Sequence, residues 1–187
     1  MTTLAVSEPQ KIERVNTIRQ PYIDEVFDLY NGNLGDVAHV GIDYLGITSR
    51  DDEKPVLGTS GFPTCLVATG YDSLSGDSFL FHKSNAVPRK FLINVYSALP
   101  EGDYDVTVFR TPGLYPSEAE SEIREILSME QFFRVKLHLN DVINLTQKSP
   151  GGNSPCDGIA LDSRTGNHYT YRLDEPRESD RSRLIEI

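Results

Sequence analysis

The chain has 187 residues, of which 38% are hydrophobic and 25% charged, a composition typical of one globular domain with a substantial core. Acidic residues outnumber basic ones by 28 to 18, and the net charge of −10 disfavours nucleic acids and anionic membranes as partners. No apolar run approaches the roughly 18 residues that a membrane-spanning helix needs, so we expect no transmembrane segment.

The first ten residues, MTTLAVSEPQ, lack the basic start and the apolar stretch of a cleavable secretory signal. We therefore expect a protein that works in the cytoplasm, or one that is delivered into a host cell without a cleavable signal peptide. The chain has two cysteines, Cys65 and Cys156, too few for a disulfide scaffold or a Cys-rich zinc site. A reduced thiol, and so a candidate nucleophile, is the natural expectation.

The N-terminal part of the chain predicts one helix followed by strands. Residues 1–20 are polar and mixed, whereas residues 23–30 space apolar groups at helical intervals before the breaker NGNLGD. From residue 37 onward, short apolar or alternating runs are bounded by Gly, Pro, Asp, Asn or Ser. These runs predict strands at residues 37–47, 64–71, 78–82, 91–96, 104–109, 132–139, 158–162 and 168–173.

A second helix is predicted between the strands. Ser117 and Glu120 form a capping-box pattern, and an apolar stripe then continues to about Met129. Two turn sequences, at residues 98–104 and 162–168, predict hairpins between the strands that flank them.

The C-terminal third also contains less regular stretches. In the hairpin at residues 162–168, Gly166 is placed where a positive φ is expected. Residues 147–158, with two prolines and three glycines, predict a long loop. The tail after Leu173 mixes acids with arginines and is expected to be solvated or frayed. The pattern as a whole predicts an α+β domain, mainly an antiparallel β-sandwich with one or two flanking helices.

Metal and cofactor sites are not indicated. The four histidines, His39, His82, His138 and His168, have no metal-ligand spacing between them, and no phosphate-binding fingerprint is present. We expect neither a metal nor a cofactor. His39 and His138 fall within alternating strand patterns and are assigned no role.

The informative stretch is residues 58–82, GTSGFPTCLVATGYDSLSGDSFLFH. A turn containing Gly and Pro delivers Cys65 to the start of an apolar strand, where its sulfur could be exposed. An antiparallel hairpin with its turn near Gly76 would bring His82, at the end of the next strand, back toward Cys65. A thiol needs such a neighbour, because only a few per cent is ionised at neutral pH. The stretch therefore predicts a Cys/His dyad.

Two other interpretations of these residues remain open. Cys65 could be a small buried hydrophobe with a structural histidine nearby, as is common for cysteine. Cys156, within the predicted loop, competes as a nucleophile, although no histidine has a sequence-derived reason to meet it.

The same residues resemble a known family, the chemoreceptor glutamine deamidases of the CheD type. That family has a threonine six residues before the catalytic cysteine, a strand ending in Tyr-Asp, and a catalytic histidine 17 residues after the cysteine. The matching positions here are Thr59, Gly61, Thr64, Cys65, Tyr71, Asp72 and His82. The resemblance covers roughly residues 56–173 and includes the GGN at residues 151–153. A similar Cys/His core occurs in cytotoxic necrotizing factor and the Burkholderia lethal factor.

The resemblance implies a layered α/β/β fold and a protein-glutamine deamidase. Cys65 would be the nucleophile, His82 the proton donor and acceptor, and Thr59 the residue that orients His82. A helical continuation is usual after the histidine in the family, whereas the run at residues 91–96 predicts a strand here. The implied partner is a target protein that carries a reactive glutamine.

On this basis, residues 51–175 are expected to form the deamidase-like domain of a monomer that is a single domain overall. Residues 1–50 would be an N-terminal extension that packs on or precedes the core, and residues 176–187 a polar tail. The unmatched N-terminus favours a toxin or effector over a deamidase of bacterial chemotaxis.

Two other function classes remain open. The first is a non-catalytic β-sandwich that binds a protein partner, with Cys65 buried and His82 incidental. The second is a cysteine peptidase that uses the same dyad. Ammonia release from an intact target distinguishes deamidation from both.

Overall fold

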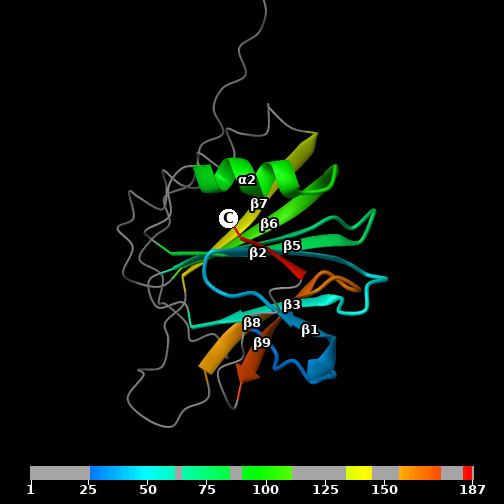
Figure 1. The fold of residues 1–187 in the computed structure, drawn as a ribbon. Coiled ribbons are helices and arrows are strands. Elements are labelled where there is room, and N and C mark those ends of the chain that lie inside the picture. Colours follow the sequence, from blue (N-terminus) through cyan, green and yellow to red (C-terminus); the bar gives the residue numbers. More distant parts are fainter. Residues whose placement is uncertain are drawn as a thin grey trace, which may run out of the picture.

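The computed structural model describes residues 26–61, 65–84, 90–110, 134–144, 156–173 and 183–186. In these residues the protein is mainly β, with two mixed open sheets packed together and one short α-helix, α2 (Lys90–Ala98) (Figure 1). The predicted preponderance of strands is thus confirmed. The sheets are mixed rather than purely antiparallel, since each contains one parallel strand pair.

The smaller sheet has four strands in the order β1-β3-β8-β9. Their bounds are β1 Val37–His39, β3 Val56–Ser60, β8 Cys156–Asp162 and β9 Asn167–Leu173. The larger sheet has six strands in the order β10-β2-β5-β4-β6-β7. Their bounds are β10 Leu184–Glu186, β2 Tyr44–Ser49, β5 Asp77–Lys83, β4 Leu66–Tyr71, β6 Gly102–Arg110 and β7 Val135–Asn144. A single turn of 3-10 helix, η1 (Leu34–Asp36), precedes β1.

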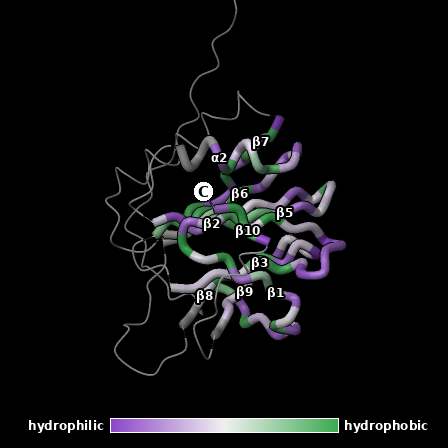
Figure 2. Tube along the Cα trace, in the orientation of Figure 1, coloured by the Kyte–Doolittle hydropathy of each residue, from purple (hydrophilic) through white to green (hydrophobic). Residues whose placement is uncertain are grey.

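The helix, the larger sheet and the smaller sheet form three layers (Figure 1). The alternation along β4 assigns its side chains to two cores. Leu66 and Ala68 face the helix, whereas Cys65 and Val67 face the smaller sheet. In Figure 2 the central strands are largely hydrophobic and hydrophilic stretches gather in the turns, as expected for sheets covered on their inner faces.

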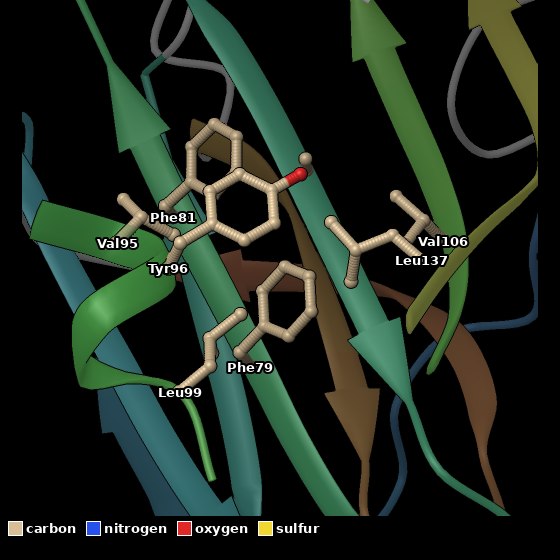
Figure 3. A pocket seen from close by; sticks show the side chains of 8 residues that line it. Phe79, Phe81, Val95, Tyr96, Leu99, Val106 and Leu137 are labelled. Carbon is tan, nitrogen blue, oxygen red and sulfur yellow. The ribbon is translucent and has the colours of Figure 1, made fainter. Parts of the chain in front are cut away.

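The core beneath the helix is rich in aromatic side chains. Figure 3 shows Val95 and Tyr96 of α2, and Leu99 directly after the helix, facing Phe79 and Phe81 of β5. The cavity they enclose is only about 10 Å³, too small for a ligand. The space between the helix and the larger sheet is therefore filled by side chains. The candidate residue Cys65 lies on the other side of the larger sheet.

The run at residues 91–96 forms part of helix α2, so its predicted strand is wrong. A short apolar run does not distinguish a strand from a helix. The burial pattern at the end of the run is helical, because Val95, Tyr96 and Leu99 are buried while Asn94 and Ser97 are exposed. Residues 98–104 consequently join a helix to strand β6 and do not form the predicted hairpin.

The predicted strand at residues 37–47 is two strands in different sheets. β1 pairs with β3, and β2 pairs with β5. Between them the chain crosses from one sheet to the other, and Asp43 has a positive φ of 65°. Asp is among the few residues that adopt this conformation readily. Residues 37–39 and 44–49 therefore each contribute a strand to one of the two sheets.

The predicted helix at residues 23–30 does not extend through its second half. The Tyr30 N–H donates to the carbonyl of Thr170 (2.8 Å), and the Thr170 N–H donates to the carbonyl of Asp28 (2.8 Å). Phe27 packs against the cluster that contains Cys65, whereas Tyr30 packs in a separate cluster with Val37 and Val56. The helical spacing of Phe27 and Tyr30 is therefore coincidental, because the two side chains do not share one face.

Part of the predicted polar tail forms a strand as well. β10 pairs antiparallel with β2 at the edge of the larger sheet, and Leu184 packs against the core between the sheets. Residues 174–182 and 187 of the tail, the helix predicted at residues 117–129 and most of the loop at residues 147–158 lie outside the described residues. The end of that loop is an exception, since residues 156–158 begin β8.

Candidate active site

The β4–β5 hairpin brings Cys65 and His82 to the same face of the larger sheet. The two strands are antiparallel, with Val67 directly opposite His82. Cys65 lies two residues before Val67, so it shares that face, and both Cys65 and Val67 belong to the core between the sheets. Cys65 and His82 are therefore diagonal neighbours, a relation that usually separates residues by about 7 Å. The hairpin predicted around Gly76, whose φ is 80°, is confirmed.

Thr59 reaches His82 from the other sheet. It lies in β3, a strand that the sequence pattern did not predict. The Thr59 Oγ1 atom lies 2.8 Å from Nδ1 of His82 and donates a hydrogen bond to the carbonyl oxygen of Val40 at 2.6 Å. The structure thus joins Thr59 and His82, which are 23 residues apart in the chain.

These two contacts determine the tautomer of His82. A hydroxyl has one proton, and that of Thr59 is directed at Val40. Toward His82 the hydroxyl must accept, so Nδ1 carries the imidazole proton and Nε2 carries a lone pair. A histidine in this state can take a proton at Nε2, which is what a general base for a thiol requires.

All three side chains are buried. His82 and Thr59 have no exposed surface, and Cys65 is 4% exposed. The expectation that a turn exposes the sulfur is therefore wrong, because Cys65 packs with Val40, Val67 and other apolar side chains between the sheets.

Burial also sets the charge of His82. It lowers the pKa of His82 to about 4, an effect that the negative charge of Asp43 opposes and that His39 reinforces. His82 is consequently neutral at neutral pH. A neutral His82 would act on the thiol as a base, by taking its proton when a reaction begins.

Sequence reasoning missed two residues beside the dyad, Asp43 and Ser84. The Asp43 N–H donates to the carbonyl of His82 (2.7 Å). Its carboxylate accepts hydrogen bonds from the N–H and the hydroxyl of Ser84, both at 3.0 Å. No sequence motif contains Asp43, and only its place at the crossing between the sheets brings it to His82.

The remaining motif residues are distant from the dyad or structural. Tyr71 and Asp72 lie at the turn end of the hairpin. Burial raises the pKa of Asp72, but hydrogen bonds from backbone N–H groups, first that of Leu74, outweigh it and lower the pKa overall. Thr64 lies outside the described residues, and Gly61 follows β3 with a φ of 71°.

The other candidates in the sequence do not join the site. Cys156 is the first residue of β8 rather than a loop residue. The exposed ring of His138 pairs with Asp103, whereas His168 lies against Phe109 and is hydrogen-bonded to Thr69 at 2.8 Å. No group of three or more His, Cys, Asp or Glu side chains that could hold a metal occurs in the described part of the chain. Nor do the described helices include one long and apolar enough to cross a membrane.

The sequence matches no model of a known protein family and no curated protein. The functional interpretation therefore depends on the geometry of Thr59, Cys65 and His82 and on their resemblance to the deamidase pattern.

Proposed function

We propose that the protein is a protein-glutamine deamidase, which converts the side-chain amide of a glutamine in a target protein into a carboxylate. Cys65 is the nucleophile, His82 transfers the proton, and Thr59 orients the His82 ring. The hydrogen bond between Thr59 and His82 carries this proposal. It links two members of the motif across the two sheets and leaves Nε2 able to take a proton from a thiol on the same face.

The reaction needs only water as a co-reactant. Nε2 of His82 takes the thiol proton of Cys65, and Sγ attacks the amide carbon. When the C–N bond breaks, the imidazolium returns that proton to the nitrogen, which leaves as ammonia. Water then attacks the thioester carbon while Nε2 of His82 takes a proton from it. When the C–S bond breaks, His82 passes that proton to Sγ, and the glutamic acid side chain is released and ionises to glutamate. The target gains one negative charge and its main chain stays intact.

The arrangement of layers also supports the proposal. The order helix, larger sheet, smaller sheet resembles the CheD-like α/β/β arrangement. In addition, α2 is the next described element after the strand that carries His82, at the place where that family has a helix. We propose a monomeric enzyme that acts on a protein in the cytoplasm, or in a host cell after delivery as a toxin or effector. A chemoreceptor deamidase of bacterial chemotaxis is the alternative.

The test is a search for deamidated glutamines in bacterial and host-cell lysates treated with the protein. We expect ammonia release and specific glutamines that gain about 1 Da, with no new fragments. The Cys65→Ser variant should abolish the change, because a hydroxyl is a far weaker nucleophile at this pH. Cys156→Ser is the matched control and should retain activity. A wild-type pattern identical to that of Cys65→Ser would contradict deamidation, and cleaved targets would favour a peptidase.

One observation favours a second candidate, a non-catalytic protein-binding module. Cys65 and His82 are almost fully enclosed, and a glutamine side chain must displace neighbouring atoms to reach them. If the wild-type protein captures a partner without releasing ammonia, and Cys65→Ser captures it equally well, the binding module is the better interpretation.

A further inference from the structure

Asp43 holds the end of the strand that carries His82. Its main-chain N–H binds the carbonyl of His82, and its carboxylate binds both the N–H and the hydroxyl of Ser84. The two contacts enclose the last residues of β5 on both sides of Lys83. The main chain of Asp43 has a positive φ of 65°, so these two contacts depend on a residue that tolerates this conformation.

Asp43 also brings an acidic group next to His82, since its main chain is hydrogen-bonded to that of His82. The other titratable residues next to His82 are Lys83, which follows it in β5, His39 of β1, Tyr44 opposite it in β2, and Cys65 before β4. The charge of Asp43 raises the pKa of His82, against the lowering by burial and by His39. Asp43 is half-buried, so water screens this charge less than it would at the surface.

We propose that Asp43 is the positioning residue of the site, which fixes the end of β5 and stabilises the imidazolium that His82 becomes when it takes the proton of Cys65. The role in catalysis rests on the deamidase proposed above. The effect on the pKa of His82 does not, because it needs only a negative charge on the residue that is hydrogen-bonded to the His82 main chain. Thr59 orients the ring through Nδ1, and Asp43 supplies the negative charge that a threonine lacks.

The decisive variant is Asp43→Asn. Asparagine tolerates a positive φ, and its amide oxygen can still accept from Ser84, so the variant removes mainly the charge. Asp52 supplies a matched control. Asp43 precedes β2, and Asp52 follows it, accepting hydrogen bonds from Thr48 and Ser49. Asp52→Asn therefore removes the same charge at the other end of the same strand.

The measurement follows the His82 ring resonance by NMR between pH 7 and pH 5, identified by its absence in His82→Asn. In the wild-type protein the resonance should begin to move at the acid end as the ring starts to protonate. In Asp43→Asn the His82 resonance should move less at each pH, because the His82 imidazolium is less stable without the Asp43 charge. In Asp52→Asn the resonance should move as in the wild type. In the deamidation assay, Asp43→Asn should lower kcat about tenfold without changing KM. This loss is part of the rate enhancement that acid–base catalysis supplies.

An Asp43→Asn protein that is folded and titrates like the wild type would overturn the proposal. If wild-type protein shows no deamidation, the proposed function fails, yet the titration still decides the role of Asp43. Should Asp43→Asn fail to fold, Asp43→Gly removes the charge at a residue that accepts the same φ. If neither folds, Asp43 is purely structural and the proposal is wrong.

Discussion

The hydroxyl of Thr59 has two hydrogen-bond partners on different segments, the carbonyl of Val40 and Nδ1 of His82. It therefore determines both the orientation of the ring and the nitrogen that carries its proton. A side chain of the same shape without a hydroxyl should keep the packing and lose this control.

We expect Thr59→Val to lower deamidation between about ten- and a hundredfold, because the wrong tautomer removes the base from Nε2. The variant should also lower the free energy of unfolding by about 1–3 kcal/mol, since it leaves buried polar groups unsatisfied. Thr59→Ser keeps the hydroxyl and should restore most of the activity. The check is the deamidation rate together with the ¹⁵N shifts of His82, which report the tautomer at neutral pH. Wild-type shifts in Thr59→Val would contradict the assigned contact.

At the scale of elements, α2 covers the face of the larger sheet opposite the proposed site. Its buried residues contact Phe79 and Phe81 of β5, the strand whose other face carries His82 (Figure 3). The helix thus supports the site from behind without contributing a chemical group to it.

We expect Leu99→Ala to lower the free energy of unfolding by about 2–4 kcal/mol, because it leaves a cavity between α2 and the sheet. Leu74 supplies a matched control, since it is 92% exposed at the turn of the β4–β5 hairpin, whereas Leu99 is 7% exposed. Leu74→Ala should change the free energy of unfolding by less than about 0.5 kcal/mol. Denaturant unfolding followed by circular dichroism measures both. Equal losses in the two variants would show that α2 is not anchored as described.

At the scale of the whole molecule, buried histidines make stability depend on pH. Burial lowers the pKa of His82 and of His168 to about 4. In the unfolded chain both titrate near 6.5. As the pH falls from about 6.5 to 4, the unfolded state takes up protons that the folded state resists, so stability falls.

The loss should reach about 3 kcal/mol for fully buried His82 and should be less for the partly exposed His168. Urea unfolding at pH 7, 6, 5 and 4 measures it. His82→Asn should flatten the dependence, because it removes one of the two buried titrating rings. A His82→Asn protein with the wild-type pH dependence would mean that His82 is not protected from protons as its burial implies.

Much of the dyad could be predicted from the sequence because a hairpin is a local structure. Strand alternation and the turn near Gly76 place Cys65 and His82 on one face, and the observed register agrees. The turn at Gly166, with its φ of 74°, was predictable for the same reason. In both cases the chain residues that interact are close in sequence, so the local pattern contains the information.

The sequence by itself determined the strand-rich class and the β4–β5 hairpin, on one face of which Cys65 and His82 lie. Only the tertiary structure decided the tautomer and the charge of His82 and the position of Asp43 beside it. The contact of Thr59 with His82 was suggested by resemblance and not by spacing, and that of Asp43 by nothing in the sequence. Both depend on how two sheets pack and where the chain crosses between them. The same packing buries His82 and makes it neutral, because the free energy of a charge depends on all the atoms that replace water around it.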